Sequence, residues 1–283
     1  MKYDYKDFFV YKYDIPKFRD FVYNEITFFK IHPTYYTSIV VFIIAFSMDK
    51  ILSEKKYSEL LYILPLTFIT FMVLSKLNII FLGLLLIYML IFRNNFSFRT
   101  KVVSVSTLFI VIITLALTVP GIKHRFREIY TSYNNPPKGL AYDSTNIRIA
   151  LIKCNLEVAK ENFITGIGFS DILNTLHECQ SSNYDAGFYK NKKYLTHNYF
   201  FYILITTGIF GLLAFIYYCF IVVRKSIAIN RFLLYVMLVN VFLVCLTEDF
   251  FYRHYGLFYF SLILMTFIGW YQQNNTTVNK KAL

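Results

Sequence analysis

Long apolar runs recur along this sequence, and they constrain its fold more than any other feature. A helix needs about 20 predominantly apolar residues to cross the hydrocarbon core of a bilayer. Hydrophobic residues make up 57% of the 283-residue chain, whereas roughly 45–50% is usual in soluble domains. The sequence therefore predicts an all-α, polytopic transmembrane helical bundle with about seven spans, at residues 33–48, 60–74, 77–92, 102–119, 199–223, 232–246 and 251–270.

One long polar stretch, residues 120–196, separates the fourth expected span from the fifth. Basic residues in short loops mark the cytoplasmic side of a membrane protein. We therefore expect a single membrane domain over residues 1–283, a cytoplasmic C-terminus and a large extracytoplasmic loop at 120–196 that contains short helices. The basic residues that fix this orientation are Lys50, Lys55, Lys56, Arg93, Arg99, Lys101, Arg224, Lys225, Arg231, Lys280 and Lys281.

The same orientation places the N-terminus outside, although no span precedes it. Residues 1–30 nevertheless carry six basic side chains. Two interpretations remain open. The chain is the C-terminal part of a longer protein with earlier spans, or residues 1–30 form a partly interfacial helix that is anchored by its phenylalanines.

The formal net charge of +12 does not require a nucleic-acid partner. Basic inner loops and a phosphate-bearing lipid substrate both explain it, and no nucleic-acid-binding motif accompanies it. The four cysteines have no metal-site spacing, so we expect neither a metal nor a cofactor. Cys154 and Cys179 both lie in the long loop, where a disulfide and two free thiols remain equal alternatives.

Several ionisable residues lie at the expected outer ends of the spans. His32 precedes Pro33, which is typical of a helix start, but a site role also remains open. Lys76, in the short turn after the second span, either reaches lipid headgroups or points at an anionic substrate. The last outer turn contains four ionisable residues that pair among themselves or line a pocket: Glu248, Asp249, Arg253 and His254.

The long loop contains a second group of candidates. Apolar residues at positions 147, 151, 154 and 158 follow helical spacing, and Arg148 lies at the start of that run. A guanidinium can bind phosphate with two parallel hydrogen bonds, although a surface salt bridge is the more usual arrangement. Gly166 and Gly168 end the expected helix in a turn that favours glycine.

His197 opens the fifth span and is the strongest single candidate for chemistry. An imidazole can exchange protons near neutral pH, although a histidine at a helix start is more often a hydrogen-bonding partner. Asn198 is expected to cap the span, and Gly208 and Gly211 to allow close helix packing. On these residues alone, an enzyme and a transporter remain equal alternatives.

Taken together, these segments resemble the O-antigen ligase and O-antigen polymerase superfamily. The shared pattern is an arginine-led helix, a Gly-x-Gly turn, and a His-Asn pair followed by two glycines. A His-Pro-x-Tyr span start, a Ser-Lys turn and a closing Thr-Glu segment complete it. The matching residues are His32–Tyr35, Ser75–Lys76, Arg148, Gly166–Gly168, His197–Asn198, Gly208, Gly211 and Thr247–Phe250.

The resemblance implies glycosyl transfer without a metal and with inversion at the anomeric carbon. The donor would be a polyprenyl-diphosphate-linked glycan, and the acceptor a sugar hydroxyl of lipid A-core or of a growing glycan. The reaction would take place at the outer face of the bacterial inner membrane. His197 would act as base with Arg148 as its catalytic partner, and substrate would be bound by Lys76, His32, Arg253 and Glu248.

This assignment makes a spatial prediction: Lys76, Arg148 and His197 converge on one outward-facing cavity. Three alternatives remain. A protein O-oligosaccharyltransferase shares these motifs, and a truncated, inactive relative would keep only the fold, since members usually have more spans before the first one seen here. A transporter or flippase of lipid-linked sugars would carry charges within its spans, whereas these spans are nearly free of charge.

Overall fold

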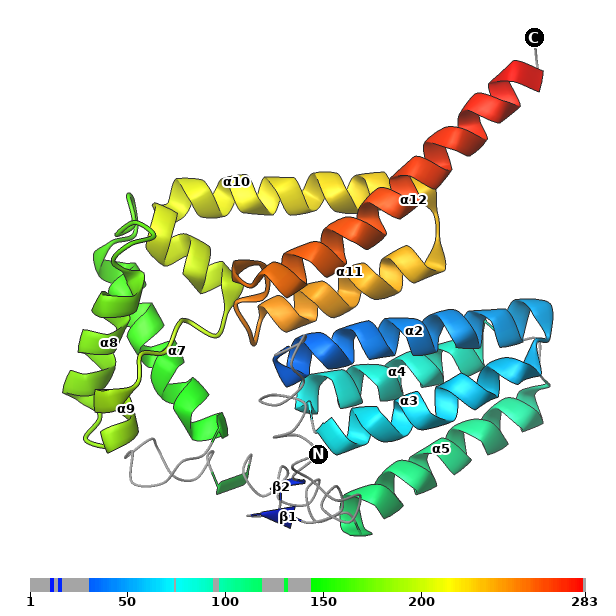
Figure 1. Cartoon of the computed structure of the whole chain (residues 1–283), viewed down its shortest axis with the longest axis horizontal. Coiled ribbons are helices and arrows are strands. Elements are labelled where there is room, and N and C mark those ends of the chain that lie inside the picture. The colour runs from blue at the N-terminus through cyan, green and yellow to red at the C-terminus, as the bar shows by residue number, and fades with distance from the viewer. Residues whose placement is uncertain are drawn as a thin grey trace, which may run out of the picture. The chain divides into compact units, whose positions relative to one another are not determined.

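The computed structural model describes residues 11–12, 15–16, 31–73, 75–93, 97–118, 130–131 and 144–281, and the structural statements below concern these residues. The elements are helices, apart from two short antiparallel strands, β1 (Tyr11–Lys12) and β2 (Ile15–Pro16). The expected all-α fold is therefore confirmed (Figure 1). The chain divides into two compact units, Met1–Arg127 and Glu128–Leu283, so a single membrane domain stays a prediction.

The first unit is a group of apolar helices at the positions of the first four expected spans. α2 packs against α3 and α4, and α4 packs against α5. Pro65 lies inside α3. The elements are α2 (Pro33–Glu54), η2 (Tyr57–Glu59), α3 (Leu60–Val73), α4 (Lys76–Phe92) and α5 (Phe98–Thr118).

A buried amide holds the beginnings of α2 and α4 together within this unit. Asn78 is fully buried, and its Nδ2 donates to the Thr34 carbonyl (2.8 Å), to Thr37 Oγ1 (2.6 Å) and to Ser38 Oγ (3.2 Å). Such bonds between helices satisfy polar groups that cannot reach water. The starts of α2 and α4 therefore lie at the same end of the first unit, as the alternation of the expected spans requires.

The second unit combines three helices of the polar region with three apolar ones. α7 packs against α8 and α10, and α11 packs against α10 and α12. The elements are α7 (Ser144–Glu161), α8 (Ile172–Asn183), α9 (Gly187–Asn191), α10 (Tyr199–Ile229), α11 (Phe232–Cys245), η3 (Phe250–Tyr252) and α12 (His254–Lys281).

Two helices in the described part of the chain are long and apolar enough to cross a membrane. They are α2 and α10. Shorter apolar segments cover Tyr57–Val73, Lys76–Phe92 and Phe232–Cys245. Length and composition alone thus support membrane helices in both units, and each of the seven expected spans overlaps a helix in the described part of the chain.

α10 is broken at Gly208, and the break is bonded to the turn that follows α7. Gly208 has a φ of 68°, and Figure 1 shows the change of direction in this helix. The carbonyls of Ile205 and Thr206 accept hydrogen bonds from the amides of Ile167 (2.8 Å) and Gly168 (2.9 Å). Backbone groups that the break removes from the helix are thereby satisfied, as burial requires.

The glycines at this junction are required by close backbone contact. A Cβ on Gly166, whose φ is 69°, would lie 2.6 Å from the backbone of Thr206. A Cβ on Gly208 would collide with the carbonyl of Ile164. Gly208 therefore approaches a turn, and not the neighbouring helix that the sequence led us to expect. A Cβ on Gly211 would meet a side chain one turn earlier in α10 itself.

Candidate functional site

His197 lies in the segment that joins α9 to α10, two residues before α10 begins. Its backbone is left-handed, with a φ of 48°, a conformation that is uncommon for residues other than glycine. Asn198 follows as the N-cap of α10, and its Oδ1 accepts hydrogen bonds from the amides of Phe200 (3.0 Å) and Phe201 (3.2 Å). Its Nδ2 donates to the Leu246 carbonyl (3.1 Å), which ties the start of α10 to the end of α11.

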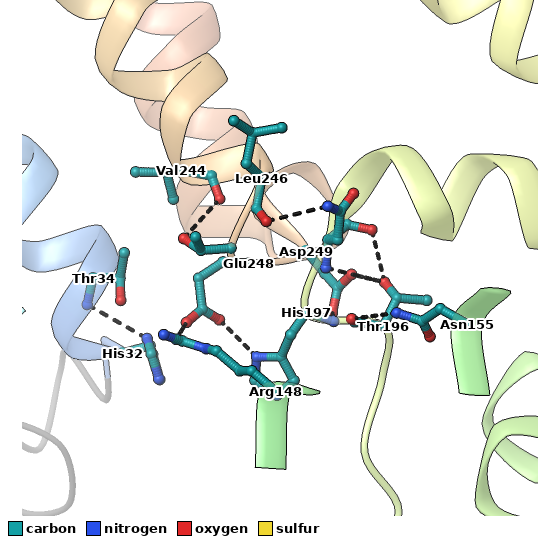
Figure 2. Close-up of polar contacts among 12 residues, drawn as sticks. His32, Thr34, Arg148, Asn155, Thr196, His197, Val244, Leu246, Glu248 and Asp249 are labelled. Atoms are coloured by element: carbon teal, nitrogen blue, oxygen red, sulfur yellow. Dashed lines mark hydrogen bonds and ion pairs between the residues drawn. The ribbon is translucent and has the colours of Figure 1, made fainter. Parts of the chain in front are cut away.

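Glu248 joins Arg148 to His197. Its carboxylate Oε1 accepts a hydrogen bond from Arg148 Nη2 at 2.6 Å, and its Oε2 lies 3.2 Å from His197 Nδ1 (Figure 2). Glu248 is buried, whereas about a third of the Arg148 side chain and a quarter of the His197 side chain are exposed. Three residues that are far apart in the sequence thus form one charged cluster within the second unit.

This contact selects the tautomer of a neutral His197. An ionised carboxylate only accepts hydrogen bonds, so the nitrogen that faces it must carry the proton. Because Glu248 faces Nδ1, the lone pair of the neutral ring is on Nε2. An imidazole held in this way can accept a proton at Nε2, and the carboxylate can stabilise the positive charge that results.

Asp249, the next residue, holds the backbone of His197. Its Oδ2 accepts a hydrogen bond from the His197 amide at 3.0 Å, and its Oδ1 accepts one from the Thr196 hydroxyl. Burial raises the pKa of Asp249, a shift that these two hydrogen bonds and the nearby imidazole oppose. The sequence placed Asp249 beside Glu248 in the last outer turn, but it did not indicate that Asp249 holds the backbone of His197.

α7 and α8 are joined by a disulfide between Cys154 and Cys179, whose Cα atoms lie 5.9 Å apart. The structure thus selects the disulfide from the two alternatives that the sequence left open. Glu157 lies beside both sulfurs and completes a group with the composition of a metal site. Because both sulfurs are joined in the disulfide, this group presents no thiolate to a metal.

The remaining predicted residues lie at the ends of helices. His32 is the N-cap of α2, where its Nδ1 accepts a hydrogen bond from the Thr34 amide (3.4 Å). Lys76 is the first residue of α4. Both belong to the first unit, so their convergence with Arg148 and His197 stays a prediction. Arg253 follows η3 and is exposed.

The sequence of the chain was also compared with known proteins. The family model described as O-antigen ligase matches residues 61–216, which is more than half of the 283 residues. The chain belongs to the O-antigen ligase family. Proteins of the O-antigen ligase family are membrane proteins that transfer glycans from lipid carriers. A search of curated proteins found no match.

The O-antigen ligase match covers only part of the cluster. It runs from α3 to the middle of α10 and includes Lys76, Arg148 and His197. His32 precedes the matched region, and Glu248 follows it. The link from Arg148 through Glu248 to His197 therefore rests on the geometry of the structure.

Proposed function

We propose that this protein transfers a glycan from a polyprenyl-diphosphate carrier to a sugar hydroxyl, without a metal and with inversion at the anomeric carbon. The observation that carries the proposal is the bridging of Arg148 and His197 by the buried carboxylate of Glu248. Membership of the O-antigen ligase family supports the class of reaction. The acceptor is lipid A-core in a ligase and a growing glycan in a polymerase.

His197 is the base in this proposal. The acceptor oxygen attacks the anomeric carbon while its proton moves to Nε2 of the imidazole, and the bond to the diphosphate breaks with its electron pair on the leaving oxygen. Glu248 keeps the proton on Nδ1 and stabilises the imidazolium that forms. The proton taken up by His197 is then released to water, which restores the neutral ring.

Arg148 stabilises the leaving diphosphate. A guanidinium has five N–H donors, and within the described residues Glu248 accepts from one of its terminal nitrogens. The other donors can bind phosphate oxygens as their charge grows during bond breaking. Removing one such contact typically raises the barrier by about 3–4 kcal/mol. Lys76 is the second cation that we assign to the diphosphate.

The proposed membrane arrangement assigns one span to each of seven helices. In this proposal α2, α3, α4, α5, α10, α11 and α12 each cross the bacterial inner membrane, and the region of α7 to α9 lies outside the cytoplasm. The disulfide between Cys154 and Cys179 supports that side, because disulfides form in oxidising compartments. His197 and Glu248 then lie at the outer ends of α10 and α11.

The test is expression in a bacterium that lacks its own ligase and polymerase but makes a lipid-linked glycan. Wild type is compared with His197→Ala and with His177→Ala, a control in α8. Glycan on lipid A-core indicates a ligase, a ladder of repeat lengths a polymerase, and glycan on protein the oligosaccharyltransferase alternative. We expect His197→Ala to lower the product on the order of 10²-fold or more, and the control to retain it. Equal product from His197→Ala would refute His197 as the base.

A further inference from the structure

The segment that leads to His197 is held in place by hydrogen bonds from buried side chains. Residues 192–196, here named the connecting strand, run from α9 towards α10 without regular structure. Lys192 and Lys193 are exposed, whereas Tyr194 and Thr196 are buried. A segment with no internal hydrogen bonds needs partners for its buried backbone groups.

Two buried amides supply those partners, one from each disulfide-linked helix. Asn155 of α7 donates from Nδ2 to the Thr196 carbonyl at 2.8 Å. Gln180 of α8 donates from Nε2 to the Tyr194 carbonyl at 3.3 Å. Both amide side chains are fully buried. They hold carbonyls two residues apart on the connecting strand.

These amides are unfavourable choices for stability alone. Asn155 Oδ1 and Gln180 Oε1 are buried and accept no hydrogen bond from the described part of the chain. A buried acceptor without a partner typically costs about 1–3 kcal/mol, so each amide satisfies a carbonyl of the connecting strand while leaving an acceptor of its own unpaired. The two amides therefore add little net stability but fix the position of the connecting strand, a conflict that is expected at functional sites.

The disulfide sets the spacing between the two amides. Cys154 directly precedes Asn155 and Cys179 directly precedes Gln180, so the covalent bond joins α7 to α8 beside the two donors. The helices therefore cannot separate at that level without breaking it. The connecting strand is held against a fixed pair of hydrogen-bond donors.

The hydrogen bonds that hold the connecting strand extend from Thr196 to His197. The Thr196 carbonyl binds Asn155, and its hydroxyl donates to Asp249, which also accepts from the His197 amide. His197 has a positive φ, and such a conformation persists only when its surroundings fix it. Figure 2 shows Asn155, Thr196 and Asp249 meeting beside His197.

We propose that Asn155 is a positioning residue that acts on His197 through Thr196. The inference rests on the proposed function, in which His197 is the base. Asn155 touches no reacting atom. Its loss frees the Thr196 carbonyl, allows the connecting strand to shift and moves Nε2 away from the acceptor hydroxyl. The rate of the chemical step falls, while binding of the lipid-linked donor is unchanged.

The test uses the purified full chain in detergent with a polyprenyl-diphosphate glycan donor and its acceptor. Asn155→Leu is compared with Asn162→Leu. Asn162 directly follows α7, and its amide donates to the Val158 carbonyl of that helix rather than to the connecting strand. We expect Asn155→Leu to lower kcat on the order of 10- to 100-fold with the KM for donor unchanged. Its melting temperature should stay close to that of wild type, because the unpaired Asn155 Oδ1 disappears while the Thr196 carbonyl becomes unpaired in its place. A kcat equal to that of wild type would overturn the proposal.

A double mutant separates positioning from general structure. If Asn155 acts through His197, adding Asn155→Leu to His197→Ala causes no further loss of the residual rate. Losses that multiply would overturn the proposal. Full activity of His197→Ala would instead refute the base, whatever Asn155→Leu does. If Asn155→Leu does not fold, Asn155→Ser, which is too short to reach the Thr196 carbonyl, takes its place and is judged by the same kcat.

Discussion

At the scale of single residues, Glu248 has the most consequential contacts. The sequence led us to assign it to substrate binding, yet its carboxylate lies against Arg148 and His197. These partners are 100 and 51 residues away along the chain. Separations of this size explain why no local pattern could identify the bridge. An arginine and a histidine beside one buried carboxylate form a unit in which each member fixes the others.

Glu248→Gln tests this bridge while keeping the size of the side chain. A glutamine amide can donate a hydrogen bond to Nδ1, which would stabilise the tautomer with its proton on Nε2 and remove the base. We expect the transfer rate to fall on the order of 10²-fold or more, with the KM for donor much less affected. The kinetics of the purified variant provide the measurement, and a wild-type rate would contradict the role of Glu248.

Asp249 should make stability depend on pH. Burial raises the pKa of Asp249 in the folded protein above the value in the unfolded chain. The folded state therefore binds this proton more tightly, and the contribution is lost as pH rises through the raised pKa. Melting curves should show wild type losing stability relative to Asp249→Asn as pH increases from the ordinary titration range of aspartate. A difference between the two proteins that is independent of pH would contradict this expectation.

At the scale of elements, the junction between the turn after α7 and the break in α10 organises the second unit. The amide of Ile209 donates to the Phe163 carbonyl at 2.8 Å, on the side of the break opposite to the bonds from Ile167 and Gly168. The sequence indicated both glycine pairs but not their contact. A helix break of this kind depends on a partner elsewhere in the chain, so the apolar run around Gly208 gave no sign of it.

Gly208→Ala should disrupt this junction. A side chain at positive φ costs about 1–3 kcal/mol, and the new Cβ would also collide with the Ile164 carbonyl. Gly269→Ala is the matched control, because a Cβ there meets nothing within 4 Å in α12. We expect Gly208→Ala to melt several degrees below wild type, by about 2–4 °C per kcal/mol in a unit of this size. The control should melt at or above the wild-type temperature, and equal melting of the two variants would contradict the account.

The disulfide stabilises the contact between α7 and α8. It joins residues 25 apart, for which loop-closure entropy predicts roughly 3–4 kcal/mol. We expect Cys154→Ser and chemical reduction to lower the melting temperature to a similar extent, because both remove the same bond. Cys219→Ser, which removes a thiol in α10 that is not bonded, serves as the control. If the migration of the wild-type protein on a denaturing gel does not change on reduction, that result would contradict the disulfide.

At the scale of the whole molecule, the sequence was most informative about the helices and least informative about their contacts. Each of the seven apolar runs overlaps a helix, because the length of an apolar run can be read from a single stretch of sequence. The sequence alone did not determine the disulfide, the cluster around Glu248 or the hydrogen bonds that hold the connecting strand. Each depends on distant residues that folding brings together. The match to the O-antigen ligase family then connects a membrane scaffold to glycan transfer.

The central claim is that Arg148 and His197 act as one unit around Glu248. The most direct measurement is the rate of glycan transfer by purified Arg148→Ala, His197→Ala and the double variant, all in one assay. Residues that act as a unit have effects that do not add. We predict that each single variant loses on the order of 10²-fold or more, and that the double variant is no slower than the slower single variant. A wild-type rate in either single variant, or losses that multiply in the double variant, would contradict the claim.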